Sequence, residues 1–410
     1  MIPLSLFLGL LQAIEVIVFI YLALTSIYVF VFAVASLFPL PKYPEKQIPL
    51  KRFAVLIPCY KEDDVIYDVA REALNQNYLT DSFDVVIIAD KFEQATVEKL
   101  LELPIILFNE KFEISTKTRA LNHALKHLPK DQYDAVCILD ADNIMENDFL
   151  LKMNAALSNG YVAVQGHRIA KNLNTGFAIL DAMSEEINNQ IFRKGQRVLG
   201  LSSALIGSAM AFDFTFFKKL MADIEVVGGF DKEIELRLLS NKYKIEYIPE
   251  AIVYDEKVQN VKIFTQQRRR WISAQFHYFG KHFIPATKAL IREGNGEYFN
   301  KAFQYLQLPR ILLLGSLFVL TLTSFLFGIP THPFYWSISL IIIILALILS
   351  IPKSFYTIGT LKALIYLPVG FTFMFLSLLN IRGANKQFIH TKHTYNAFQI
   401  KKKHRFHNKS

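Results

Sequence analysis

Asp140 and Asp142 lie one residue apart and directly follow the apolar run of residues 135–139. A buried strand that ends in this way brings carboxylate oxygens to the carboxyl edge of a sheet, where open α/β sheets bind their ligands. Oxygen ligands of this kind suit Mg²⁺ or Mn²⁺, which usually keep several waters and bridge to substrate phosphates. The pair therefore indicates a divalent metal site for a phosphorylated substrate.

A second set of chemically capable side chains occupies residues 267–271, Gln-Arg-Arg-Arg-Trp, just before the apolar C-terminal part of the chain. An arginine can pair with a phosphate through two hydrogen bonds, and a tryptophan can stack on the face of a sugar. The alternative is an amphipathic helix at a membrane surface, with Arg268 and Arg269 on lipid phosphates. Together with Asp140 and Asp142, this string points to chemistry on a nucleotide diphosphate at a membrane surface.

The residues that must position these motifs alternate between strand-like and helix-like patterns. Short apolar runs predict strands at 53–57, 83–89, 105–108 and 135–139, and helical spacing predicts helices at 65–76, 93–101 and 118–128. This order predicts an α/β domain with a mostly parallel, doubly wound sheet. Neither Gly-x-Gly-x-x-Gly after the first strand nor a P-loop sequence occurs, which argues against dinucleotide-binding and P-loop domains.

The chain is too apolar for an ordinary soluble protein, because 52% of its 410 residues are hydrophobic and its mean hydropathy is +0.27. Apolar residues gather at the two ends, and a spanning helix needs about 20 of them. The only charge within residues 2–40 is Glu15, and this run is too long for a cleaved signal peptide. We predict a transmembrane signal anchor at 1–41, a soluble domain at 51–296, two membrane helices within 303–352, a further membrane helix at 355–381 and a basic tail at 382–410.

Basic residues set the expected orientation. Lys and Arg first appear after the signal anchor, and the tail holds eight of them with no Asp or Glu. The positive-inside rule therefore places the soluble domain and the tail in the cytoplasm of a multi-pass cell (inner) membrane protein. Pro368 and Gly370 interrupt the last apolar segment, which favours an interfacial or re-entrant helix; a third C-terminal span with an external tail is the alternative. The basic excess favours membrane lipids over nucleic acid as a partner, since no nucleic-acid motif occurs.

The chain resembles the membrane-bound family 2 glycosyltransferases, the group that contains cellulose, chitin and hyaluronan synthases. The resemblance covers residues 55–271 and the membrane flanks. It rests on strings in a fixed order: VLIPCYKE at 55–62, IIAD at 87–90, KTRALN at 117–122, DAD at 140–142, GSAM at 207–210, FDKE at 230–233 and QRRRW at 267–271. It implies a GT-A-type (Rossmann-like) sheet domain that transfers a sugar, with inversion, from a nucleotide sugar, expected to be a UDP-sugar.

The resemblance also implies roles for single residues. Asp142 is expected to hold Mg²⁺ or Mn²⁺ at the diphosphate. The residues expected to bind the nucleotide sugar are Pro58, Tyr60, Glu62, Asp90, Lys117 and Asp140. The residues expected at the acceptor or the pyrophosphate are Gly207, Ser208, Gln267, Arg270 and Trp271. Two alternatives stay open, namely that Asp90 caps the next helix and that Lys117 is solvated.

Asp231 is the candidate catalytic base, which would take the proton of an acceptor hydroxyl as its oxygen attacks the anomeric carbon. The family pattern places a Glu before this Asp, but Phe230 occupies that position here. Glu233, two residues after Asp231, is therefore the fallback base. The alternative is that both acids only stabilise the start of a helix through its dipole.

We therefore expect a membrane-embedded glycosyltransferase that acts on a growing polysaccharide or a lipid-linked acceptor. The alternatives are the transfer of a single sugar to a polyprenyl phosphate or another lipid, and a catalytically inactive scaffold in envelope assembly. Intact Asp140, Asp142 and Asp231 argue against the scaffold. Three spans are few for a polysaccharide channel, so a homo-oligomer or a partner export protein is expected to complete one. Residues 388–392 loosely resemble the gating loop of cellulose synthases, and a plain basic tail is the alternative.

Overall fold

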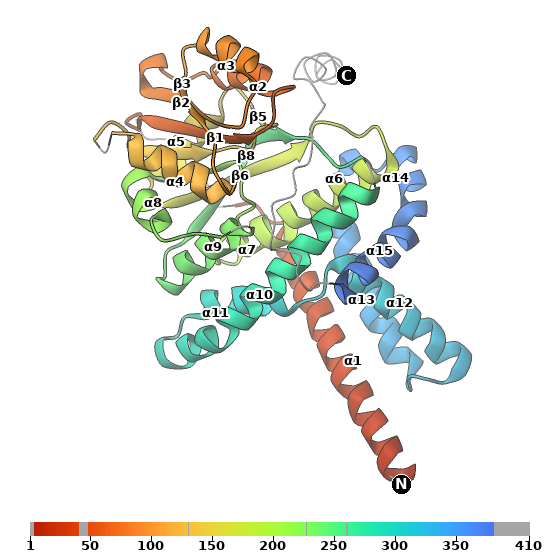
Figure 1. Ribbon diagram of the computed structural model, residues 1–410. Helices are drawn as coiled ribbons and strands as arrows, with labels where there is room; N and C mark the ends of the chain where they lie inside the picture. Colours follow the sequence, from red (N-terminus) through yellow and green to blue (C-terminus); the bar gives the residue numbers. More distant parts are fainter. Residues whose placement is uncertain (1–3, 41–47, 130, 227, 260, 381–410) are drawn as a thin grey trace.

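A run of four parallel strands forms the first half of the sheet, as the sequence predicts. The computed structural model describes residues 4–40, 48–129, 131–226, 228–259 and 261–380 (Figure 1). Its first four strands lie in the order β3-β2-β1-β4. They are β1 (Phe53–Tyr60), β2 (Phe83–Asp90), β3 (Ile106–Glu110) and β4 (Ala135–Ile138). Their apolar runs are nearly continuous because helices cover both faces of the sheet.

Helices from both halves of the domain cover the sheet (Figure 1). One face packs against α2 (Ile66–Ala73), α3 (Gln94–Leu101) and α5 (Phe149–Ser158). The other face packs against α4 (Lys117–His127), α8 (Phe214–Met221) and α9 (Phe230–Ser240). This arrangement leaves the carboxyl edge of β1, β2 and β4 as the place where loops and helix starts meet.

The second half of the sheet is mixed, and the sequence patterns did not predict its strands. The full order is β3-β2-β1-β4-β7-β6-β8-β5, in which β7 runs antiparallel to both of its neighbours. The added strands are β5 (Ile144–Met145), β6 (Ala163–Ala170), β7 (Met210–Asp213) and β8 (Ile245–Asp255). Two of them are too short to carry a periodic signal, and their place in the sheet depends on pairing between distant segments.

A helical excursion between β6 and β7 connects the sheet to the apolar helices. It comprises α6 (Gly176–Asn188), the π-helical turn η2 (Asn189–Gly195) and α7 (Gln196–Val198). The excursion touches α1 (Leu4–Ala35) at Gly195, where a β-carbon would lie 2.2 Å from the carbonyl oxygen of Phe32. Only glycine permits so close an approach of the two backbones.

Four helical stretches among the described residues are long and apolar enough to cross a membrane. They coincide with the predicted apolar segments: Gly9–Ala35 within α1, α12 (Arg310–Phe327), α13 (Pro333–Ser350) and the stretch Ile358–Leu379. This last stretch consists of α14 (Ile358–Ala363), a 3₁₀ turn (Leu364–Tyr366) and α15 (Leu367–Leu379). α10 (Val261–Glu293) and α11 (Gly296–Leu306) connect the sheet domain to α12 (Figure 1).

The hydroxyl group of Tyr28 fastens α1 to α7 and α11. It donates a hydrogen bond to Oδ1 of Asn300 (2.7 Å) and accepts hydrogen bonds from Nε2 of Gln196 (3.0 Å) and Nε2 of Gln304 (2.9 Å). One donor and two acceptor positions are all that a phenol has. The apolar helix α1 is therefore joined to the sheet domain through a satisfied polar contact.

We expect Tyr28→Phe to destabilise the protein by about 1–3 kcal/mol, because two amide donors and one acceptor lose a common partner in a buried site. The measurement is the thermal unfolding midpoint in detergent. Tyr335→Phe is the matched control, since the ring of Tyr335 is 55% exposed on α13. Equal midpoints for the two variants would contradict this account of the joint.

Candidate active site

The two aspartates of the Asp-x-Asp motif lie at the carboxyl end of β4 in different surroundings. Asp142 is 2% exposed, and its carboxylate accepts hydrogen bonds from the backbone N–H of Glu256 (2.7 Å) and from Nδ2 of Asn143 (3.1 Å). The side chain of Asp140 is 34% exposed and faces Lys117 and Arg168. Neutral donors therefore hold Asp142, whereas cations hold Asp140.

Lys117, the first residue of α4, joins the Asp140 carboxylate to the loop before β7. Its Nζ donates to Oδ1 of Asp140 and to the carbonyl oxygen of Gly207 (2.7 Å). The alternative that Lys117 is merely solvated is therefore wrong. Burial would raise the pKa of Asp140, but Lys117 and Arg168 outweigh it and hold this pKa below its usual value. Asp140 is thus ionised at neutral pH.

Gly207 brings the candidate base next to this pair. Its φ of +86° lies in the left-handed region that favours glycine, and a β-carbon there would lie 3.9 Å from Cγ of Asp231. Nζ of Lys117 lies 5.2 Å from the ring centre of Phe230, the residue that replaces the Glu of the family pattern. The loop at Gly207, the Lys117–Asp140 pair and the start of α9 therefore converge on one place.

The fallback base, Glu233, is engaged in a separate ion-pair group. Its side chain is 5% exposed, and its carboxylate accepts from Nε of Arg237 (3.0 Å) and Nζ of Lys281 (3.0 Å). Burial would raise the pKa of Glu233, but Lys281 and Arg237 hold it below its usual value. Two cations thus occupy Glu233, which favours Asp231 as the base.

The residues expected around the nucleotide lie at the ends of β1 and β2. Tyr60 and Asp90 are paired in the last register position of these parallel strands, and Pro58 lies two residues earlier in β1. Asp90 is 3% exposed and accepts a hydrogen bond from the backbone N–H of Phe112 (3.2 Å). α3 begins after Glu93, without a side-chain cap, so the alternative that Asp90 caps the next helix is wrong. Glu62, just beyond β1, is buried as well.

Gln267, Arg270 and Trp271 lie on α10, and α6 connects this part of the chain to the Asp140 group. Trp271 is 44% exposed, and the guanidinium of Arg268 lies 4.3 Å from its ring centre. Arg268 also pairs with Asp181 of α6. The side chain of Arg268 is therefore engaged inside the protein, which disagrees with the interpretation that it binds a lipid phosphate.

Several buried charges of the site were missed by the sequence analysis. Glu185, one turn after Asp181 on α6, accepts from Nε of Arg168 in β6 (2.7 Å) and pairs with Lys257. Lys257 also pairs with Asp255, the last residue of β8, at 2.7 Å. The available signal was an aspartate at the end of an apolar run, as in the case of Asp90, and acids four residues apart on one helix face.

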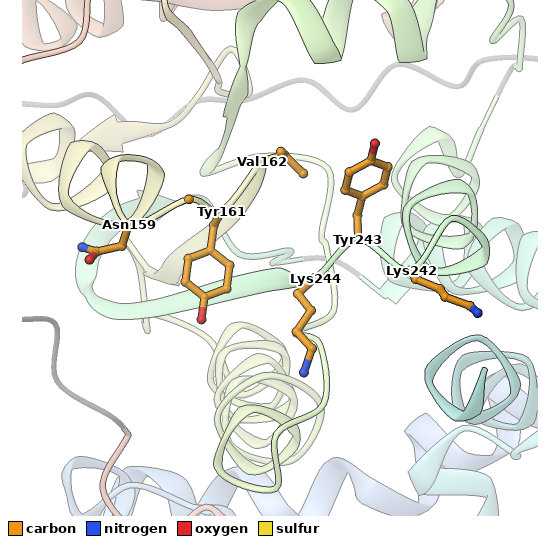
Figure 2. A pocket seen from close by; sticks show the side chains of 7 residues that line it. Asn159, Tyr161, Val162, Lys242, Tyr243 and Lys244 are labelled. Carbon is orange, nitrogen blue, oxygen red and sulfur yellow. The ribbon is translucent and has the colours of Figure 1, made fainter. Parts of the chain in front are cut away.

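A pocket of about 300 Å³ lies at the opposite edge of the sheet, at the amino ends of β6 and β8. Figure 2 shows Asn159 and Tyr161 on one side of it, and Lys242 and Tyr243 on the other. None of the residues expected to take part in catalysis lines this pocket, so it is separate from the site at Asp140.

The Asp140 group fits a divalent cation that is shared with a substrate. Among the described residues, no group of three His, Cys, Asp or Glu side chains is arranged to hold a metal. Asp140 and Asp142 nevertheless supply hard oxygen donors at one sheet edge. Mg²⁺ and Mn²⁺ accept one or two carboxylates of this kind when water and substrate phosphates complete their coordination. The donor set therefore suits a cation that arrives with a diphosphate.

The comparison with protein families agrees with this geometry. Residues 50–274 match the family described as Glycosyltransferase like family 2. The chain belongs to this family. It is 26% identical to the probable glycosyltransferase YdaM of Bacillus subtilis, over 251 residues that make up 57% of each chain. It is 25% identical to a beta-monoglucosyldiacylglycerol synthase of Trichormus variabilis, over 263 residues that make up 60% of this chain and 54% of that protein. The chain thus spans little more than half the length of these family 2 relatives.

The fold agrees with a solved glycosyltransferase structure. The chain is similar to mannosyltransferase PcManGT from Pyrobaculum calidifontis in complex with GDP-Man and Mn²⁺, with a TM-score of 0.52, 17% identity and coverage of 83% of this chain and 97% of that one. The predicted GT-A-type sheet domain is thereby confirmed. Neither the family nor these relatives point specifically to cellulose, chitin or hyaluronan synthases, so this finer part of the resemblance lacks support.

Proposed function

We propose that this family 2 protein is a membrane-embedded inverting glycosyltransferase that uses a nucleotide sugar, expected to be a UDP-sugar. The observation that carries the proposal is the convergence of Asp140, Lys117 and Asp231 around Gly207. This places a metal-compatible carboxylate, a cation and a second carboxylate, that of Asp231, at one sheet edge. An inactive scaffold would have no need of such a group.

The proposed chemistry assigns one task to each of these residues. Asp231 takes the proton from the acceptor hydroxyl, whose oxygen forms a bond to the anomeric carbon while the bond from that carbon to the diphosphate oxygen breaks. Attack opposite the leaving group inverts the anomeric carbon. Lys117 places a positive charge beside the diphosphate. A divalent cation at Asp140 and Asp142 would, when bound, offset the charge that grows on the leaving diphosphate.

We propose a lipid as the acceptor. The name of the Trichormus relative supports a diacylglycerol-type acceptor, and so does the presence of four apolar helical stretches. The string of residues 267–271, with its exposed Trp271, favours the elongation of a polysaccharide as the second candidate. Both candidates need an acceptor hydroxyl near Asp231, so the site chemistry is the same.

The nature of the product distinguishes these candidates. The full chain is incubated in nanodiscs with labelled UDP-sugars and Mn²⁺, with diacylglycerol, a polyprenyl phosphate or no added acceptor lipid. A product that is soluble in organic solvent, carries one sugar and requires the added lipid is expected. A water-soluble ladder of products that forms without added lipid would overturn the lipid acceptor and support polysaccharide elongation.

We propose that the stretch Ile358–Leu379 lies along the cytoplasmic face of the membrane. α12 begins at α6, where Nη2 of Arg310 donates to the carbonyl oxygen of Ser184 (3.0 Å). The start of the stretch also lies at α6 (Figure 1), because a β-carbon at Gly359 would lie 3.9 Å from Cδ1 of Ile179. After α15, the carbonyl oxygen of Asn380 accepts from Nε of Arg269 on α10 (2.5 Å). Both ends of the stretch therefore contact helices on the side of the sheet domain.

This topology predicts which added cysteines react with a membrane-impermeant reagent. A cysteine at Ser410 is expected to react only after cells are opened, because the basic tail favours the cytoplasmic side. A cysteine at Thr331, between α12 and α13, is expected to react in intact cells with a permeable outer barrier. The native Cys59 and Cys137 are both buried and give little background. Labelling of Ser410 from outside would mean that the last stretch crosses the membrane.

A further inference from the structure

Arg168 contacts three buried or half-buried carboxylates of the site. Its Nε lies 2.7 Å from Glu185, and its Nη1 lies 3.5 Å from Asp140 and 3.5 Å from Asp255. Nη1 also donates to Oγ of Ser208 (3.2 Å). The side chain of Arg168 is only 13% exposed, so solvent screens these interactions poorly.

Nitrogen donors occupy the positions between the carboxylates that could share a cation. Nη1 of Arg168 is equally distant from Asp140 and Asp255. In the same way, Nδ2 of Asn143 lies 3.1 Å from both Asp142 and Asp255. The guanidinium of an arginine is effectively always charged in proteins. A fixed positive charge at this point opposes the entry of a second cation.

We propose that Arg168 is a positioning residue that occupies Asp140 and Asp255 until the donor arrives, and so makes metal binding depend on the nucleotide diphosphate. The diphosphate of the donor brings negative charge, which can accept the cationic partners of Asp140. It also supplies the phosphate oxygens that complete the coordination of the metal. Metal and nucleotide then bind together, and a free metal ion is excluded. This inference rests on the proposed function, because it assumes a nucleotide sugar as the donor.

The test measures the binding of Mn²⁺ to the full chain in nanodiscs, with and without UDP. Free Mn²⁺ is quantified from its electron paramagnetic resonance signal. The wild-type protein is expected to bind Mn²⁺ weakly alone and tightly with UDP. Arg168→Gln is expected to raise the affinity for Mn²⁺ without UDP by roughly tenfold or more, because a positive charge next to two carboxylates is lost. The same variant is also expected to show a smaller increase in Mn²⁺ affinity when UDP is added. A merely structural role of Arg168 would not increase metal affinity.

Two controls separate charge from folding. Arg168→Lys keeps the charge and is expected to keep weak binding of Mn²⁺ in the absence of UDP. Arg52→Gln removes a partly exposed ion pair with Asp84 at the amino end of β1. It is expected to leave the affinity for Mn²⁺ unchanged, with and without UDP. If Arg168→Gln does not fold, the wild-type titration still decides, because tight binding of Mn²⁺ without UDP would overturn the proposal.

The outcomes also separate this inference from the proposed function. UDP-dependent binding of Mn²⁺ in the wild-type protein, together with unchanged metal affinity in a folded Arg168→Gln variant, would overturn only the role of Arg168. No binding of Mn²⁺ to the wild-type protein even with UDP would overturn the metal-dependent nucleotide site, and the role of Arg168 with it.

Discussion

Asp231→Asn is expected to leave nucleotide binding nearly unchanged and to lower turnover by roughly 10²–10⁴-fold, which is the usual contribution of a positioned base. Asparagine has almost the same shape as aspartate but cannot accept the proton of the acceptor hydroxyl. Asp231 lies beside Gly207, whose carbonyl oxygen accepts a hydrogen bond from Nζ of Lys117. The lost carboxylate therefore adjoins the expected diphosphate position. The measurements are the steady-state turnover of the purified protein and the affinity for UDP.

Glu233→Gln is the matched control for the base. The carboxylate of Glu233 pairs with Arg237 and Lys281, so the change removes an ion-pair group between α9 and α10. We expect a lower unfolding temperature, with most of the turnover of the folded molecules retained. An inactive Glu233→Gln protein beside an active Asp231→Asn protein would show that the wrong acid was assigned.

Asp142→Asn is expected to abolish turnover and to weaken the binding of UDP in the presence of Mn²⁺. The amide oxygen can still accept the hydrogen bond from the backbone of Glu256, which Oδ2 of Asp142 accepts at 2.7 Å. The local fold is therefore expected to survive, and the loss reflects the missing charge beside the diphosphate and its metal.

Asp148→Asn serves as the control for this metal-site variant, because the side chain of Asp148 is 41% exposed and pairs with Lys152 at 2.8 Å. It should behave as the wild-type protein in both turnover and Mn²⁺-dependent UDP binding. Near wild-type turnover of Asp142→Asn would instead contradict the assignment of Asp142 as a metal ligand.

The first half of the sheet domain could be predicted from the sequence because its signals are local. Three of its strands, β1, β2 and β4, are runs of mostly apolar residues buried on both faces, and each helix between the strands shows one apolar face. The strands of the second half were not predicted, because β5 has only two residues and the longer β6 and β8 carry polar residues such as His167, Arg168 and Glu250 within their runs. Their positions follow from pairing with strands that are distant in the sequence.

The candidate site divides in the same way. Asp140, Asp142 and Lys117 stand next to a strand end or a helix start, so short motifs reveal them. The role of Arg168 depends on Glu185 and Asp255, which come from α6 and β8 and share no local pattern with it. The engagement of Arg268 with Asp181 likewise depends on how α6 packs against α10. Sequence patterns therefore reveal the chemical groups but not the charges that balance them.

The most direct test of the central claim is the release of nucleotide diphosphate by the full chain in lipid nanodiscs with Mn²⁺, across a panel of UDP- and GDP-sugars. The account predicts release from one nucleotide sugar, a requirement for a divalent cation, and loss of release in both Asp142→Asn and Asp231→Asn. Lack of release from every donor, in protein that is folded and supplied with lipid acceptors, would contradict the account and favour an inactive scaffold.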